Sequence, residues 1–274
     1  MTQTPAGAGS AAVPAPRDEG AVLALQVEHL TVRYGSLTAL SDVSWTVDDG
    51  EILGVIGPNG AGKSSSFAAV SGTVPSQGTC ILYGRSTAGM STQAIARAGL
   101  RRTFQQNSFF GGLTVLENAM ATFQVEGGTR LGASIVTPWR EARERARCRE
   151  QAAALLEDFG VDRRYHGLFP DDVPYGLQRV LSIVLAYGGG TRVLLVDEPA
   201  AGVGGADMQA LADLLRELRR RGTAMVLIEH HMDLVMDIVD RLCVIDRGHQ
   251  IAYGSCAQVQ QDPAVLEAYL GRTA

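Results

Sequence analysis

A glycine-rich turn constrains this chain more than any other feature of its sequence. The turn follows residues 51–56 (EILGVI), an apolar run typical of a buried strand, and precedes a helix expected at about 62–70. It reads Gly57-Pro58-Asn59-Gly60-Ala61-Gly62-Lys63-Ser64, which matches G-x-x-x-x-G-K-[ST]. A strand that passes through such a turn into a helix is the opening unit of a parallel α/β sheet. The turn therefore predicts an α/β fold of the P-loop type.

The chemistry of the turn favours a nucleoside triphosphate bound with Mg²⁺. Glycines allow consecutive backbone N–H groups to converge on one anion, and the helix N-terminus adds partial positive charge. Lys63 is the single lysine among 24 Lys and Arg residues, and its ammonium can reach the β- and γ-phosphates. Ser64 is placed to bind Mg²⁺, and Ser65 to contact the α-phosphate. The predicted ligands are ATP and Mg²⁺.

Two carboxylates follow a second apolar run. Residues 192–196 (RVLLV) predict a buried strand, and Asp197 and Glu198 come directly after it. In open α/β sheets, ligands bind at the C-terminal edge of the strands. Asp197 is therefore expected to hold Mg²⁺ through water, and Glu198 to act as the general base that activates the attacking water. The expected activity is ATP hydrolysis.

Strands and helices alternate along most of the chain. The pattern predicts further strands at about 25–34, 43–48, 224–228, 242–246 and 251–253. It predicts further helices at about 91–98, 114–123, 138–159, 206–221 and 231–239. One face of the 206–221 helix carries Leu211, Leu214, Leu215 and Leu218. This alternation indicates a largely parallel sheet with helices packed on it.

Composition argues against several other classes of protein. The net charge of −5 disfavours a nucleic-acid-binding surface, so no nucleic acid is expected as a partner. No window approaches ~18 consecutive apolar residues, so we expect no transmembrane helix. Residues 1–20 are interpreted as a disordered tail, which leaves one domain at 21–274. The widely spaced cysteines (Cys80, Cys148, Cys243 and Cys256) indicate reduced thiols in a cytosolic protein.

With these motifs the chain resembles the ATPase subunits of ABC transporters, over about residues 24–272. The resemblance implies a P-loop core with an antiparallel β layer near the N-terminus and a helical subdomain at about 96–180. It assigns Tyr34 to stacking on adenine and His230 to sensing the γ-phosphate. It assigns Gln105, in the segment RTFQ, to Mg²⁺ and to coupling with the membrane partner. The adjacent His231 is interpreted as a bystander.

A closer resemblance is to the larger ATPase subunit of branched-chain amino-acid importers. It rests on the strings RTFQ, LTVLENAM, YG-x-Q-R, DEPAAG, LIEHHMDLVM and a terminal AYLG. It implies transmembrane permease subunits, a second ABC ATPase subunit and an extracytoplasmic solute-binding protein as partners. The implied location is cytoplasmic, on the inner face of the cell membrane. We expect the permease to dock on residues 106–115, where Phe109 and Phe110 lie in a glycine-rich turn.

Two segments depart from the family pattern. The signature is usually LSGGQ, or L-[SA]-Y-G-Q in this subfamily, and here it reads Val173-Pro174-Tyr175-Gly176-Leu177. Tyr175 and Gly176 can still offer backbone N–H groups to a partner's nucleotide, but Pro174 has neither a hydroxyl nor an N–H. Gly204 stands where the D-loop carries Asp or Asn. Because both motifs act across a dimer interface, an asymmetric heterodimer is predicted.

Other functions stay open at this point. The solute could be urea or an amide, and the transporter could be an exporter. A soluble ABC ATPase of translation or DNA repair would carry two cassettes or a long coiled coil, whereas this sequence shows one cassette and no heptad run. A degenerate module that binds without hydrolysing is opposed by the intact Glu198 and His230.

Overall fold

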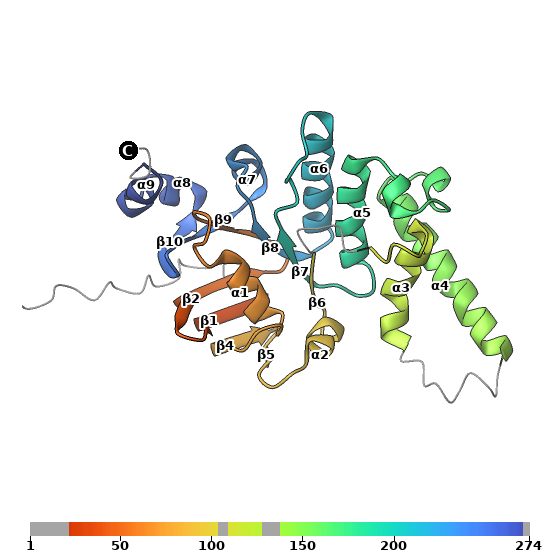
Figure 1. Cartoon of the computed structure of the whole chain (residues 1–274), viewed down its shortest axis with the longest axis horizontal. Helices are drawn as coiled ribbons and strands as arrows, with labels where there is room; N and C mark the ends of the chain where they lie inside the picture. The colour runs from red at the N-terminus through yellow and green to blue at the C-terminus, as the bar shows by residue number, and fades with distance from the viewer. Residues whose placement is uncertain (1–21, 104–108, 128–137, 271–274) are drawn as a thin grey trace, which may run out of the picture.

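The computed structural model describes residues 22–103, 109–127 and 138–270, and these residues form two β-sheets with helices around them (Figure 1). Within them the larger sheet has six strands in the order β10-β9-β3-β8-β7-β6. The strands are β3 (Ile52–Ile56), β6 (Leu100–Arg102), β7 (Val193–Asp197), β8 (Ala224–Ile228), β9 (Arg241–Asp246) and β10 (His249–Ser255). Strands β9, β3, β8, β7 and β6 pair in parallel, and β10 pairs antiparallel to β9. The predicted α/β fold is confirmed.

The centre of this sheet is fully buried. Every residue of β3, β7 and β8 is buried, which is the pattern of a parallel sheet covered on both faces. Because these strands are parallel, their C-terminal ends meet at one edge. That edge receives the glycine-rich turn after β3, the two carboxylates at the end of β7 and the histidines after β8.

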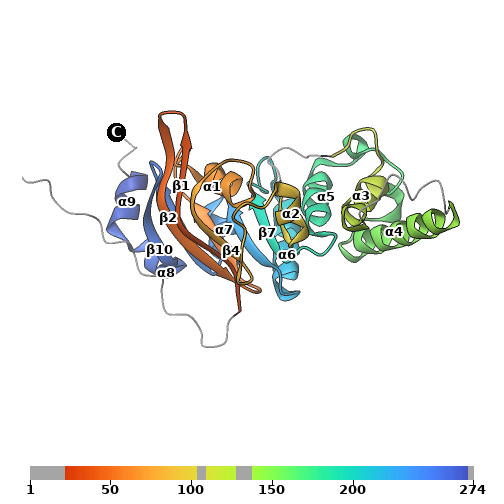
Figure 2. The ribbon, with the colours of Figure 1, turned by 90° about the horizontal axis from the view of Figure 1, so that it is seen from below.

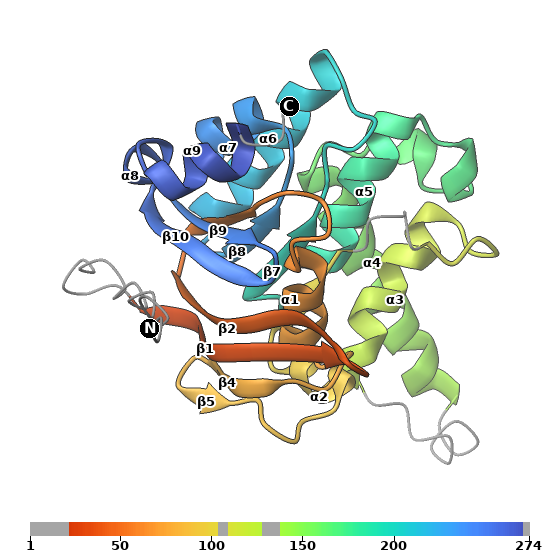
Figure 3. The ribbon, with the colours of Figure 1, turned by 60° about the vertical axis from the view of Figure 1, so that its left-hand side comes forward.

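Helices cover both faces of the six-stranded sheet. On one face, α1 (Lys63–Val70) lies between the two sheets (Figure 3). The opposite face carries α6 (Ala206–Arg220), α7 (Met232–Ile238), α8 (Cys256–Gln260) and α9 (Pro263–Leu270). The predicted leucine face of α6 is confirmed, since all four leucines are buried in the core beneath it.

The second sheet is antiparallel, as the family resemblance implies. Its order is β2-β1-β4-β5, with β1 (Leu23–Tyr34), β2 (Leu37–Asp48), β4 (Gln77–Leu82) and β5 (Arg85–Ser86). Seen from below, this sheet lies in front of α1 (Figure 2). Trp45 of β2 and Phe67 of α1 are fully buried in the apolar layer between the sheets. The sheet therefore fixes α1, the helix that begins at the glycine-rich turn.

The remaining helices extend to one side of the molecule (Figures 1 and 2). They are α3 (Val115–Gly127), α4 (Pro138–Asp158) and α5 (Tyr175–Tyr187), with short 3₁₀ turns η1 (Arg163–Tyr165) and η2 (Pro170–Asp172). The short helix α2 (Thr92–Arg97) lies instead next to β6. An edge-to-face contact between Phe159 and Tyr187, with ring centroids 5.4 Å apart, joins the end of α4 to the end of α5. No helix among the described residues has both the length and the apolar character needed to span a membrane.

Several elements differ from the sequence prediction. Strands β4, β5 and β6 and helices α8 and α9 were not predicted. β4 and β5 are mostly exposed or half-buried and β6 has three residues, so no apolar alternation marks them. β2 begins at Leu37 rather than at residue 43. The register shifts in its pairing with β1 break the two-residue period over the first half of the strand.

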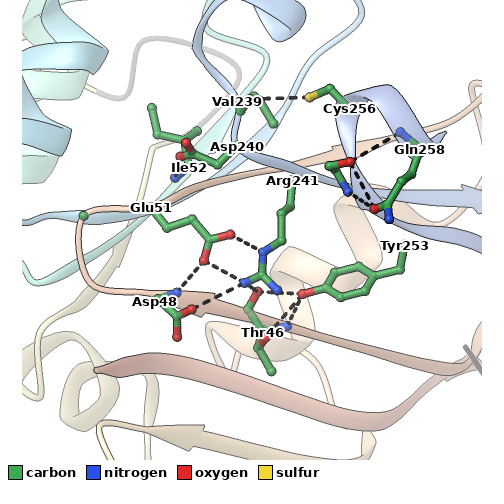
Figure 4. Close-up of polar contacts among 12 residues, drawn as sticks. Thr46, Asp48, Glu51, Ile52, Val239, Asp240, Arg241, Tyr253, Cys256 and Gln258 are labelled. Carbon is green, nitrogen blue, oxygen red and sulfur yellow. Dashed lines mark hydrogen bonds and ion pairs between the residues drawn. The ribbon is translucent and has the colours of Figure 1, made fainter. Parts of the chain in front are cut away.

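A charge network joins the two sheets (Figure 4). It lies at the start of β3 and β9, whereas the glycine-rich turn follows the end of β3. The Arg241 guanidinium, at the start of β9, donates to Glu51 through both Nε and Nη2, the latter at 2.7 Å. It also donates to the Thr46 carbonyl of β2 at 3.2 Å. Tyr253 Oη donates to the same carbonyl at 3.1 Å. The network therefore connects the antiparallel sheet to β3, β9 and β10 through groups that are only slightly exposed.

Candidate active site

Two glycines of the turn are required by its geometry. Gly57 has φ 148°, and a Cβ there would lie 1.9 Å from the Ile245 carbonyl oxygen. Gly62 has φ 107°, and a Cβ there would lie 2.4 Å from the Ala39 carbonyl oxygen. A side chain at either position would collide with backbone that cannot move aside. The turn thus packs directly on β9 and β2 before it enters α1.

The turn lines a cavity of about 200 Å³. Its lining consists of Ala39, Asn59, Gly60, Ala61, Gly62, Lys63, Ser64, Ser65 and Glu198. The cavity therefore brings one of the two predicted carboxylates to the predicted phosphate site, although 134 residues separate Glu198 from Ser64 in the sequence (198 minus 64). α1 begins at Lys63, so the N-terminus of that helix faces the cavity as an anion site requires.

Lys63 is held against the turn itself. Its ammonium donates to the carbonyls of Gly57 at 2.7 Å and Pro58 at 2.9 Å. Burial lowers the pKa of Lys63, and the negative charges of Glu198 and Asp197 oppose that shift. A positive charge therefore sits at the rim of the cavity, close to both predicted carboxylates.

Asp197 lies at the end of β7, where residues of β6 and the segment after it hold it. Arg102 Nη2 donates to Asp197 Oδ2 at 2.7 Å, and the backbone N–H of Asp197 donates to Thr103 Oγ1 at 3.0 Å. Burial raises the pKa of the Asp197 carboxyl, and Arg102 pulls it back down. Sequence reasoning missed Arg102 and Thr103, because the three-residue strand β6 that positions them carries no pattern of its own.

Glu198 and His230 meet at the cavity. His230 Nε2 lies 3.0 Å from Glu198 Oε1, and the backbone N–H of Glu198 donates to the Ile228 carbonyl at 2.9 Å. Glu198 has φ 46°, a left-handed conformation that is unusual for a residue with a long side chain. Such strained conformations persist only where surrounding contacts enforce them, and they concentrate at functional sites.

Glu229, which sequence reasoning also missed, lies behind this pair. It follows β8, and its carboxylate is 1% exposed. It accepts the backbone N–H of Ala200 at 2.7 Å and that of His230 at 2.7 Å. The sequence held a signal for it, since Glu229 directly follows a buried strand just as Glu198 directly follows β7.

Two other predicted residues are Tyr34 and Gln105, of which the structure describes only Tyr34. Tyr34 ends β1 opposite Leu37 and is 46% exposed, five residues before Ala39 of the cavity lining. Its side chain is thus accessible to solvent, although it does not belong to the cavity lining. Gln105 lies outside the described residues, which stop at Thr103 and resume at Phe109.

The altered signature forms the start of α5. Pro174 takes the N-cap position without a side-chain cap, and the helix begins at Tyr175. Tyr175 Oη donates to the Ala201 carbonyl at 3.0 Å, which ties the signature to the loop after β7. A Cβ on Gly176 would lie 2.3 Å from the Asp207 carboxylate, so that carboxylate rests against Gly176. An acidic group therefore stands beside the N-terminus of α5.

The donor groups suit Mg²⁺. Asp197 Oδ1 is buried and has no hydrogen-bond partner among the described residues, so one carboxylate oxygen is available to a cation or its water. Ser64 supplies a hydroxyl on the cavity wall. Mg²⁺ prefers a few oxygen ligands of this kind together with substrate phosphates.

Comparison with known families decides the assignment. The family model for ABC transporters matches residues 40–201, more than half of the chain. The chain belongs to the ABC transporter family. A second model, for branched-chain amino acid ATP-binding cassette transporters, matches residues 249–274. This ABC protein is therefore an ATP-binding cassette ATPase, and ATP is its nucleotide.

The ABC ATPase has several characterised relatives. The high-affinity branched-chain amino acid transport ATP-binding protein LivG of Salmonella typhimurium is 36% identical, over 90% of this chain and 97% of LivG. BraF of Pseudomonas aeruginosa, with the same description, is 34% identical over the same shares. The lipopolysaccharide export system ATP-binding protein LptB of Haemophilus influenzae is 32% identical, over 90% of this chain and 97% of LptB.

The fold agrees with solved cassettes. The crystal structure of the ADP conformation of MJ1267, an ATP-binding cassette of an ABC transporter, superposes with a TM-score of 0.77 at 26% identity. The match covers 91% of this chain and 99% of that one. The resemblance inferred from the sequence motifs is thus confirmed for the family and for the fold.

Proposed function

We propose that this ABC ATPase hydrolyses ATP to drive uptake of branched-chain amino acids. One observation carries the chemistry: Lys63, Ser64 and Glu198 line a single cavity, and His230 contacts Glu198 at its rim. The solute is proposed from the similarity to LivG and BraF and from the family model that matches residues 249–274. An exporter is the second candidate. It is supported by the similarity to LptB, which is less identical to this chain than LivG and BraF are.

Nucleotide binding follows from the turn. Backbone N–H groups of the turn and the N-terminus of α1 surround the phosphates, and the Lys63 ammonium leaves its contacts with Gly57 and Pro58 to meet the β- and γ-phosphates. Tyr34 offers its exposed ring to adenine. Ser65 contacts the α-phosphate. The phosphates thus take the place of the two backbone carbonyls that Lys63 contacts in their absence.

Hydrolysis is assigned to Glu198. Its carboxylate accepts a proton as a water oxygen attacks the γ-phosphorus, the bond from that phosphorus to the β–γ bridging oxygen breaks, and ADP keeps the electron pair. His230 holds the carboxylate in place through the 3.0 Å contact and senses the γ-phosphate. Ser64, Asp197 and Gln105 are the proposed holders of Mg²⁺. When bound, the ion neutralises phosphate charge.

The same proposal includes the partners. We place the ATPase on the inner face of the cell membrane, bound to transmembrane permease subunits and working with an extracytoplasmic solute-binding protein. Residues 106–115 are proposed as the docking segment, of which 106–108 lie outside the described residues. Phe110 is 65% exposed, whereas Phe109 packs partly into the core. Cross-links placed at Phe110 should therefore reach the permease.

A second, different ABC ATPase is the proposed dimer partner. The signature at α5 lacks the serine hydroxyl and one N–H that would meet a γ-phosphate, and each such contact is worth about 1.5–3 kcal/mol. A loss of that size weakens closure of a composite site by about tenfold to a hundredfold. The Asp207 carboxylate beside Gly176 adds repulsion. In a heterodimer, the intact Lys63 and Glu198 would instead face a normal signature.

The heterodimer is tested in the reconstituted transporter. Glu198→Gln in this chain should remove nearly all ATPase activity, while the matching substitution in the partner should remove little. Equal losses from both substitutions would show that the altered signature is adequate and that the two sites are equivalent.

The solute is tested in proteoliposomes that contain the permeases and the solute-binding protein. ATP-driven accumulation of leucine, isoleucine and valine should exceed that of urea and acetamide, and Glu198→Gln should abolish it. Glu217→Gln, on α6 and outside the cavity lining, serves as the matched control and should transport normally. Accumulation of urea or acetamide in preference to leucine would refute the amino-acid assignment without affecting the ATPase assignment.

A further inference from the structure

Glu229 makes an unusual set of contacts for a residue outside the catalytic pair. Its Oε1 accepts the Ala200 N–H at 2.7 Å. Its Oε2 accepts the N–H groups of His230 at 2.7 Å and His231 at 3.0 Å, and lies 3.2 Å from His231 Nδ1. All of these contacts converge on a side chain that is 1% exposed. His231, interpreted from the sequence as a bystander, is thus part of this cluster.

These contacts connect the two segments that carry the reaction. Residues 198–200 follow β7, and residues 228–230 comprise the last residue of β8 and the two that follow it. Glu198 N–H donates to the Ile228 carbonyl, Ala200 N–H donates to Glu229, and His230 Nε2 meets Glu198 Oε1. Three polar contacts therefore join the two segments, and Glu229 makes the central one.

The geometry of Glu198 requires such support. Its φ of 46° places it in the left-handed region, where a glutamate stays only if neighbouring contacts hold the backbone. In the segment after β7, the Glu198 N–H donates to the Ile228 carbonyl. Two residues later, the Ala200 N–H donates to the Glu229 carboxylate. In the segment after β8, Glu229 fixes the backbone N–H of His230, whose ring touches the Glu198 carboxylate.

We propose that Glu229 is a positioning residue that holds Glu198 and His230 in register with each other for hydrolysis. This inference rests on the proposed roles of Glu198 and His230. The buried carboxylate suits the task because it only accepts hydrogen bonds, and every group that faces it on these segments is a backbone N–H or a ring nitrogen. An amide at the same position would aim an NH₂ group at one of those N–H donors.

The decisive variant is Glu229→Gln, which keeps the size of the side chain and replaces one hydrogen bond with two opposed donors. We expect kcat at saturating ATP to fall by about 10- to 100-fold, because misplacing a reacting group by about 1 Å costs on the order of 10²-fold. The Michaelis constant and the affinity for ATP should stay within about twofold of wild type, because no contact of Glu229 reaches the cavity lining. Glu229→Asp keeps the charge and should recover part of the lost kcat.

The matched control is Glu51→Gln. Glu51 is also a buried glutamate that accepts a backbone N–H, from Asp48 at 2.7 Å, but it precedes β3 and so lies at the opposite end of the sheet. Its substitution should lower the melting temperature and leave kcat per folded molecule unchanged. If Glu229→Gln behaves like this control, with lower stability and unchanged kcat, Glu229 is structural and the proposal is overturned.

The experiment also covers a variant that fails to fold, and it separates the positioning role of Glu229 from the assigned role of Glu198. If Glu229→Gln cannot be purified folded, Glu229→Asp carries the test, and a wild-type kcat in that shorter variant would equally overturn the proposal. Wild-type protein and Glu198→Gln are measured alongside. Activity retained in Glu198→Gln would refute the assigned base, whereas loss there together with full kcat in Glu229→Gln refutes only the positioning role.

Discussion

The contact between Arg102 and Asp197 gives the most quantitative prediction. The two side chains are 15% and 1% exposed, and Arg102 Nη2 lies 2.7 Å from Asp197 Oδ2. Arg102→Met removes the cation and leaves the carboxylate buried. Breaking a buried pair in this way costs about 3–5 kcal/mol. The carboxyl can instead take up a proton, which limits the cost. The ordinary pKa of an aspartate lies about three units below pH 7, and each unit is worth about 1.36 kcal/mol, so protonation costs about 4 kcal/mol at that pH.

We therefore expect Arg102→Met to lower the free energy of unfolding by about 3 kcal/mol. For a domain of this size, each kcal/mol lowers Tm by about 2–4 °C, so the decrease should be about 6–12 °C. Adding MgATP should raise Tm more in the variant than in the wild type, because the bound ion brings positive charge back to Asp197. Thermal melts with and without MgATP measure both quantities.

A double-mutant cycle isolates the contact from other interactions of Arg102. Asp197→Asn removes the charge that needs a partner, so the double variant should lose less stability than the sum of the two single losses. Arg101→Met is the control on the same strand, since Arg101 donates to the Gly188 and Gly189 carbonyls rather than to Asp197. Additive losses for Arg102→Met with Asp197→Asn, to within about 0.5 kcal/mol, would refute the reasoning.

Three further predictions concern other parts of the molecule. Lys63→Ala should weaken MgATP binding at least about tenfold in isothermal titration, because it removes a charged phosphate contact; unchanged affinity would contradict the assigned site. Arg241→Met should leave Glu51 unpaired and destabilise the fold by about 3 kcal/mol in urea melts, with MgATP affinity preserved. Burial raises the pKa of Cys80 to about 11 and that of Cys243 to about 12, so at pH 8 both should alkylate far more slowly in native protein than in urea; equal rates would contradict their burial.

The sequence by itself determined the phosphate site and the identity of its chemical groups. A glycine-rich turn that must follow a strand and open a helix can be recognised from adjacent residues, because its geometry is local. The apolar runs of β3, β7 and β8 were equally visible, since burial on both faces leaves them apolar apart from Asp197 at the end of β7. Together these features led to the family and the α/β fold, which the comparisons confirmed.

Tertiary structure alone decided which groups support the site. Arg102 is 95 residues from Asp197, and Glu229 is 29 residues from Ala200. No local pattern records such contacts, because they depend on the order in which parallel strands lie side by side. β6 is the clearest case, since its three residues match no period, yet pairing with β7 brings Arg102 to the carboxylate. The sequence supplied the reacting groups, whereas the strand order placed the residues that hold them, because the ends of parallel strands meet only after the sheet has formed.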